Sequence, residues 1–122
     1  MLILAPTGKA AYNIKGNTIR NALAIRACPS LNNKYLDCSQ LNTLRCQVGG
    51  VKLIFLDEIS MVGNAMFTVQ INNRLKGRVL LFGGVSIIAI GDLFQLQPVM
   101  DGYIFKDVDN SEDSILAQNL WL

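Results

Sequence analysis

Histidine is absent from this sequence of 122 residues, and charged residues are scarce, at 16% of the chain. Without an imidazole the chain can form neither a Ser-His-Asp triad nor most of the zinc sites that enzymes use in catalysis. The low charge and the 51% hydrophobic content exclude a disordered tail. A chain of this length has room for one domain at most.

Cysteines and long apolar runs are also few. The three cysteines, at positions 28, 38 and 46, form no C-x-x-C pair, so neither a disulfide framework nor a zinc ribbon is indicated. The longest uncharged run, residues 79–91, is shorter than the ~18 to 20 apolar residues of a membrane helix. The first residues lack the basic region of a secretory signal. We therefore expect no membrane association and a reducing compartment.

Charge is unevenly distributed along the chain, although the formal net charge is only +2. Residues 1–52 carry seven cations and one anion, whereas residues 53–122 carry four cations and eight anions. The basic first half suits a polyanionic partner, and the carboxylates of the second half suit a metal ion. Chance asymmetry on a solvated surface is the alternative that composition leaves open.

Apolar runs and helical spacing alternate along the chain. The pattern predicts strands at 2–5, 51–56 and 85–90, helices at 9–14, 18–25, 64–76 and 111–121, and one short helix near 39–47. Continuous apolar strands are typical of a parallel sheet covered on both faces. We therefore expect an α/β fold with a mostly parallel sheet flanked by helices, which binds its ligands at the carboxyl ends of the strands.

The clearest local pattern is LIFLDE, an apolar strand followed by two acids. This is a Walker B pattern, in which Asp57 would bind Mg²⁺ directly or through water, and Glu58 would orient or deprotonate an attacking water. An acidic turn after a core strand is the alternative for this motif taken alone.

A second strand leads into GDLFQLQPV, one helix and one strand after the acid pair. Asp92 stands at the strand tip, where a nucleotide would bind. The amide of Gln95 can donate a hydrogen bond to a γ-phosphate oxygen and accept one from water, so it can sense hydrolysis without adding negative charge. The succession of the two motifs makes an ordinary turn the weaker interpretation.

A third block, APTGKAA, lies near the N-terminus and is followed by Thr18 and Arg20. Small residues let a nucleic-acid backbone approach the strand tip, where Thr7, the amide of Gly8 and the ammonium of Lys9 can bind its phosphates. The block is therefore a candidate nucleic-acid contact.

Together the three blocks resemble the Pif-type (petite integration frequency) helicases, ATP-driven superfamily-one motors that move 5′ to 3′ on single-stranded DNA. APTGKAA with NIKGNTIR is similar to the family's DNA-contacting motif Ia and its continuation, LIFLDEISMV to motif II, and FGGVSIIAIGDLFQLQPV to motif III. The resemblance covers nearly the whole chain. It implies that residues 1–122 form part of a RecA-like P-loop NTPase motor domain, domain 1A of such a helicase.

The resemblance also implies roles for single residues. Asp57 would serve Mg²⁺, Glu58 would activate water, and Gln95 would read the γ-phosphate, with Asp92 at the same ATP. The expected contacts to single-stranded DNA are Thr7, Gly8, Lys9, Thr18 and Arg20. The family implies an intracellular enzyme of the nucleus or mitochondrion, active in DNA repair, recombination and telomere maintenance.

Three departures from the family pattern are visible. Position 20 is Arg where the family commonly has His, which keeps a cation but changes its geometry. Position 97 is Gln where a second proline is usual, and this loosens the turn after Gln95. The connection GRVLL is shorter and more apolar than the polar segment expected there.

Two parts of a motor are absent from the sequence. The pair Gly8-Lys9 does not belong to a Walker A loop, because G-x-x-x-x-G-K-[ST] requires Gly at Ile3 and Ser or Thr at Ala10. The second motor domain with its arginine finger is missing too, and such a finger is worth roughly 10³ to 10⁵ in rate. We expect negligible ATPase activity from the isolated chain, and poor solubility or the need for a partner.

Two other functions stay open on the sequence alone. The first is a non-catalytic remnant that binds single-stranded nucleic acid through the basic half, and oligonucleotide binding without nucleotide turnover would favour it. The second is a P-loop ATPase whose acid pair serves a task without nucleic acid, and it would be favoured if DNA failed to stimulate a completed protein.

Overall fold

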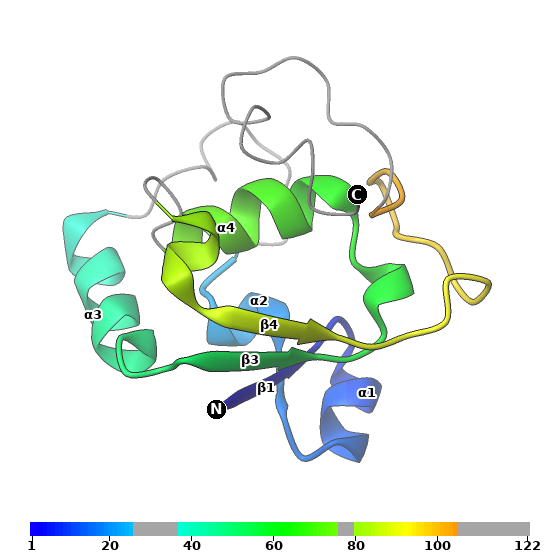
Figure 1. Ribbon diagram of the computed structural model, residues 1–122, viewed down its shortest axis with the longest axis horizontal. Helices are drawn as coiled ribbons and strands as arrows, with labels where there is room; N and C mark the ends of the chain where they lie inside the picture. Colours follow the sequence, from blue (N-terminus) through cyan, green and yellow to red (C-terminus); the bar gives the residue numbers. More distant parts are fainter. Residues whose placement is uncertain (26–36, 76–79, 105–122) are drawn as a thin grey trace.

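The computed structural model describes residues 1–25, 37–75 and 80–104. Their centre is a parallel sheet with the strand order β2-β1-β3-β4. The strands are β1 (Leu2–Ala5), β2 (Asn17–Thr18), β3 (Leu53–Leu56) and β4 (Ser86–Ala89). The register pairs Leu4 of β1 with Leu56 of β3, and Leu56 with Ala89 of β4. Because all pairs are parallel, the carboxyl ends of the strands reach one edge of the sheet (Figure 1).

Short helices follow the first two strands, α1 (Gly8–Asn13) and α2 (Ile19–Ala22). The expected α2 extended to about residue 25, but the helix ends earlier because Ala24 has a φ of 50° and the amide of Ile25 bonds back to the Arg20 carbonyl at 2.9 Å. This left-handed residue with a backward hydrogen bond is a common helix end. Gly16 leads into β2, and a Cβ there would lie 2.6 Å from the Ile3 carbonyl oxygen, so only glycine fits the crossing.

Helix α3 (Cys38–Val48) precedes β3 and is longer than the short helix expected near 39–47. Asp37 caps it by accepting a hydrogen bond from the Gln40 amide at 2.7 Å. In Figure 1, α3 lies at the left, beside the amino ends of β3 and β4 and away from the carboxyl edge.

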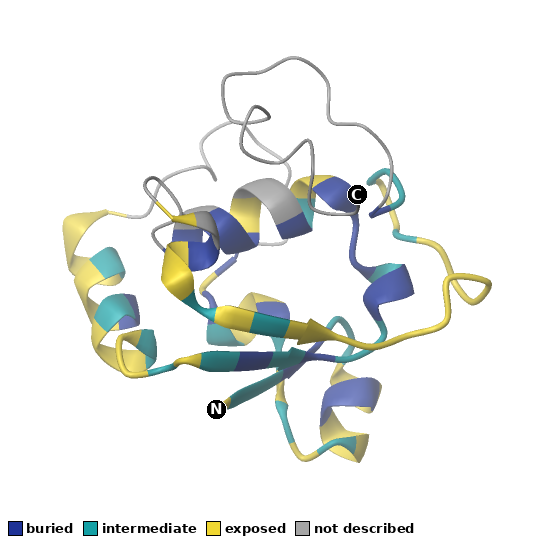
Figure 2. Ribbon diagram, in the orientation of Figure 1, coloured by how far each residue is buried: buried dark blue, intermediate teal, exposed yellow. Residues whose placement is uncertain are grey.

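The helix after β3 covers one face of the sheet (Figure 1). It combines a π-helical stretch, η3 (Met66–Ile71), with α4 (Asn72–Arg74). Phe67, Ile71 and Leu75 are all buried, which confirms the predicted apolar stripe. The ring of Phe67 packs against Phe82, with the centroids 5.1 Å apart. Figure 2 shows the buried residues of this helix gathered toward the sheet, where the main core lies.

The expectation that every strand is covered on both faces is wrong for β4. Ile88 is 46% exposed and Ile90, just after the strand, is 47% exposed. Among the described residues only β3 pairs with β4. This edge strand therefore presents apolar side chains to solvent.

The helix predicted at 111–121 lies outside the described residues. Within the described ranges, no helix reaches the length and hydrophobicity that a membrane crossing requires.

Candidate functional site

Three strand tips meet at the carboxyl edge of the sheet. The amide of Asp57 donates to the Leu4 carbonyl at 2.9 Å, which ties the end of β3 to β1. On the other side, the amide of Ile90 donates to the Leu56 carbonyl at 2.8 Å, and the amide of Ile59 donates to the Ile90 carbonyl at 3.0 Å. The three sequence blocks therefore end side by side, as the parallel topology predicts.

The acid pair lies in the middle of this edge. Asp57 and Glu58 are both half-buried, and within the described part of the chain neither carboxylate has a hydrogen-bond or ion-pair partner. Glu58 has φ and ψ of 50°, a left-handed conformation that is uncommon for a residue with a side chain, and it begins the 3₁₀ helix η2 (Ile59–Met61). Such strained backbone positions cluster at functional sites. The pair is thus held rigidly by its backbone while its oxygens stay open to a ligand.

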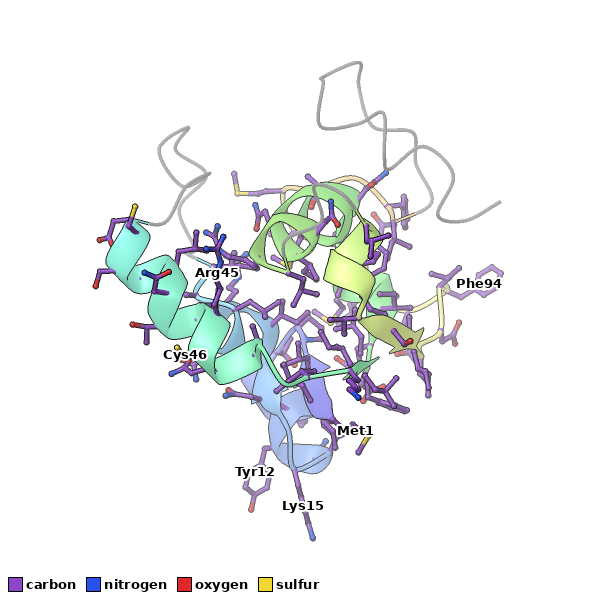
Figure 3. The ribbon with its side chains drawn as sticks, turned by 60° about the vertical axis from the view of Figure 1, so that its left-hand side comes forward. Met1, Tyr12, Lys15, Arg45, Cys46 and Phe94 are labelled. Carbon is purple, nitrogen blue, oxygen red and sulfur yellow. The ribbon has the colours of Figure 1, made fainter. Side chains whose placement is uncertain are left out.

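The segment after β4 passes directly beside the acid pair. A Cβ on Gly91 would lie 2.7 Å from the Ile59 nitrogen and 3.3 Å from the Glu58 carbonyl carbon, so the two backbones are in contact. Asp92 then shapes a turn, because its Oδ1 accepts from the Phe94 amide at 2.9 Å and its carbonyl accepts from the Gln95 amide at 3.1 Å. Gln95 is exposed in this turn, next to the fully exposed Phe94 that projects from the molecule in Figure 3.

The structure brings Asp92 next to the acid pair through the β3–β4 pairing, and Gln95 follows three residues later in the turn. The reach of the Gln95 amide to a γ-phosphate stays a prediction.

The candidate DNA contacts lie at the β1–β2 end of the same edge. Ala5 pairs with Thr18, so the two blocks that contain Thr7 and Thr18 are neighbours. Each threonine caps a helix: the Thr7 hydroxyl accepts from the Ala10 amide at 3.2 Å, and the Thr18 hydroxyl accepts from the Asn21 amide at 3.3 Å. A hydroxyl that accepts still carries its own proton, which it can donate to a phosphate.

The remaining three candidates for DNA contact are exposed: Gly8, Lys9 and Arg20. They lie in the first turns of α1 and α2, where backbone amides lack partners within the helix. Their contact with DNA stays a prediction.

The side chains at this edge would supply only part of the ligands of a magnesium ion. Within residues 1–25, 37–75 and 80–104, no group of three or more His, Cys, Asp or Glu side chains is placed to hold a metal ion. Mg²⁺ commonly takes one or two carboxylates and completes its shell with water and substrate phosphates. The open carboxylate of Asp57 suits that arrangement.

Sequence reasoning missed several buried or bridging polar residues on and beside the helix that follows β3. Asn72 is buried, and its Oδ1 accepts from the Phe82 amide at 2.7 Å. Arg74 on α4 is buried as well, and desolvation lowers the pKa of its guanidinium below the usual value. Asp101 accepts hydrogen bonds from residues 35 and 36 positions earlier. No local pattern signals the contacts of Asn72 and Asp101, because each joins segments that are separated in the sequence.

Comparison with known proteins extends over the whole chain. Residues 1–121 match the model of the PIF1-like helicase family. The chain is 32% identical to the ATP-dependent DNA helicase RRM3 of Saccharomyces cerevisiae over 126 residues, which covers 98% of this chain and 16% of that helicase. It is 31% identical to the ATP-dependent DNA helicase PIF1 of Emericella nidulans over 107 residues, 83% of this chain and 14% of the relative. The chain thus spans about one sixth of these relatives.

Solved structures give the same result for the fold. The Pif1 helicase from Bacteroides in complex with ADP-AlF3 and single-stranded DNA matches with a TM-score of 0.69 and 27% identity, over 85% of this chain and 28% of that one. A Pif1 helicase from a structure that describes DNA unwinding at forked double-stranded DNA by two coordinating Pif1 helicases matches with a TM-score of 0.72 and 30% identity. The match covers 85% of this chain and 29% of that one. The parallel sheet and its helices are therefore part of a RecA-like motor domain, and the chain belongs to the PIF1-like helicase family.

Proposed function

We propose that residues 1–122 are part of the first motor domain, domain 1A, of an ATP-dependent helicase that unwinds DNA in the 5′-to-3′ direction. The observation that carries the proposal is the parallel register, which sets Asp57 and Glu58 between the Thr7 block and the Gly91–Asp92 tip. One edge of the sheet then offers an open acid pair for ATP and a polar rim for DNA. The family membership supports this reading.

The roles at the nucleotide follow from the chemistry of each side chain. Asp57 would hold the Mg²⁺ that accompanies ATP, and the ion would neutralise phosphate charge when bound. Glu58 would accept a proton from the attacking water, for which its carboxylate must be ionised and unpaired. Gln95, with Asp92 shaping its turn, would sense the γ-phosphate and pass the change toward the DNA.

The DNA would run along the β1–β2 end of the edge. The hydroxyls of Thr7 and Thr18 and the amide of Gly8 would bind phosphate oxygens, and Lys9 and Arg20 would add positive charge. The Pif1 helicase from Bacteroides has been solved with single-stranded DNA, and this supports the choice of partner. By family, the protein would act in the nucleus or mitochondrion, in repair, recombination and telomere maintenance.

Catalysis by a helicase motor requires a Walker A loop and a second motor domain, and residues 1–122 span only about one sixth of the relatives that they match. We therefore expect ATP hydrolysis only from a fusion in which residues 1–122 replace the matching segment of the Bacteroides helicase. In that fusion, Glu58→Gln keeps the shape of the side chain but removes the base, and it should lower the DNA-stimulated kcat by roughly 10² to 10⁴.

Asp37→Asn is the matched control, because it neutralises a carboxylate that caps α3 away from the carboxyl edge. Its kcat should equal that of the parent fusion. A Glu58→Gln fusion that hydrolyses ATP at the parent rate would contradict the assignment of Glu58. A parent fusion that binds single-stranded DNA but shows no hydrolysis would favour the alternative function, a non-catalytic nucleic-acid-binding remnant with a basic first half.

A further inference from the structure

Asp101 links two segments that lie far apart in the sequence. Its Oδ1 accepts hydrogen bonds from the Ala65 amide at 3.2 Å and the Gly102 amide at 2.8 Å, and its Oδ2 accepts from the Met66 amide at 3.1 Å. The Asn64 amide donates to the Gly102 carbonyl at 2.9 Å. In Figure 1 this turn, drawn in orange, lies beside the start of the green helix. The carboxylate therefore satisfies amides at the beginning of η3, where the helix offers donors without partners of its own.

The fit around this carboxylate is close. Gly63 is buried, and a Cβ at this position would overlap the Asp101 carboxylate. A side chain at 63 would force the two segments apart. The absence of one is thus a second feature, independent of the hydrogen bonds, that allows residues 63–66 and 101–102 to pack together.

The same arrangement anchors the loop between β4 and Asp101 at both ends. At its start, Gly91 lies against the backbone of Glu58 and Ile59. At its end, Asp101 and Gly102 are bound to residues 64–66. Both anchors contact residues 58–66, a stretch that begins with Glu58, the second residue of the acid pair. Between them, all residues from 91 to 100 except Pro98 are exposed.

We propose that Asp101 is a positioning residue for Gln95, because it fixes the far end of the exposed loop to the segment that follows the acid pair in the chain. The inference rests on the proposed function, in which Gln95 reads the γ-phosphate. The loop is exposed, so its two anchors, together with the turn that Asp92 shapes, decide where the Gln95 amide stands relative to Glu58. Asp101 touches neither ATP nor the reacting atoms, and it acts through the loop.

Hydrogen exchange of the 122-residue chain tests the structural part of the inference. In Asp101→Ala, the amides of Phe94 and Gln95 should exchange about five- to tenfold faster, since the lost anchor lowers the free energy of opening the loop. Asp101→Asn keeps one carbonyl oxygen and should restore a large part of the protection. Asp37→Ala is the control, because it removes a similar cap from α3 and should leave the exchange of Phe94 and Gln95 unchanged.

If Asp101→Ala accelerates only the amides of Ala65 and Met66, Asp101 is a helix cap and the proposal is overturned. ATPase kinetics of the Bacteroides fusion test the functional part. Asp101→Ala should lower kcat about tenfold with little change in KM, because a loosely held Gln95 amide lowers the rate of the chemical step more than the affinity for ATP. An unchanged kcat beside a tenfold loss in Gln95→Ala would overturn it as well. An unchanged kcat in Gln95→Ala itself would instead contradict the proposed role of Gln95, while the exchange result would still stand.

Discussion

Gly91 is the residue at which the segment after β4 contacts the segment after β3 at the carboxyl edge of the sheet. A Cβ there would lie 2.7 Å from the Ile59 nitrogen and 3.1 Å from the Ile59 Cγ2, closer than backbone and side chain can tolerate. Gly91→Ala should therefore lower the free energy of unfolding by about 1 to 3 kcal/mol, as overpacking typically does. Urea denaturation followed by circular dichroism measures this change.

Gly50→Ala is the control for Gly91→Ala, because a Cβ on Gly50 meets no atom within 4 Å. Its midpoint of denaturation should stay near that of the parent chain. Equal midpoints for the two variants would show that the backbone at Gly91 does not contact the backbone of Glu58 and Ile59.

Single residues at the site differ in how far sequence could foresee them. Asp57 and Glu58 were predicted from an apolar run that ends in two acids, and the structure places them at a strand tip. The left-handed conformation of Glu58 was not foreseeable, since nothing in the local sequence demands it. The bridging role of Asp101 was also missed, because its partners lie 35 and 36 residues away.

At the scale of elements, apolar runs predicted the strands well, whereas helical spacing predicted the helices less well. The strands at 2–5, 53–56 and 86–89 lie within the predicted ranges, since each is a short apolar run bounded by turn residues. The two-residue β2 is too short to leave a pattern, and it exists only because Gly16 allows a close crossing of β1. The π-helical stretch η3 keeps the predicted apolar stripe buried, so the binary pattern could not reveal it.

The exposed side of β4 leads to a prediction about solubility. Ile88 is 46% exposed on an edge strand, and such strands promote aggregation unless they carry charge. Ile88→Lys should raise the concentration at which the 122-residue chain stays monomeric in light scattering. Its free energy of unfolding should change by less than about 0.5 kcal/mol, as for most surface substitutions.

Ile54→Lys is the control for Ile88→Lys, because Ile54 on the neighbouring strand is only 1% exposed. A lysine there would bury an unpaired charge and should unfold the chain. If Ile88→Lys destabilises the chain as strongly as Ile54→Lys, β4 is covered in solution and the exposed edge described above is wrong.

For the whole molecule, the parallel sheet gathers cations and carboxylates of the described residues at one edge. Parallel pairing puts Lys9 and Arg20, which follow β1 and β2, at the same edge as Asp57, Glu58 and Asp92, which follow β3 and β4. In the proposed function, the nucleotide and the nucleic acid would bind at neighbouring strand tips. The alternation of strands and helices predicted this edge, because parallel strands always present their carboxyl ends together. The positions of the side chains within the edge required the structure.

The β1–β2 end of the carboxyl edge, which carries Lys9 and Arg20, should bind single-stranded DNA with a strong dependence on salt. Each phosphate contact releases a counterion, so the slope of log K against log salt concentration should fall in magnitude by about 0.7 when Lys9 or Arg20 is replaced by alanine. Fluorescence anisotropy of a labelled oligothymidylate, titrated with the 122-residue chain at several salt concentrations, measures the slope. Lys52→Ala should leave it unchanged, because this exposed lysine precedes β3 at the opposite end of the strands. Equal losses in all three variants would mean that the DNA follows net charge rather than the strand tips, and the proposed track along β1 and β2 would have to be abandoned.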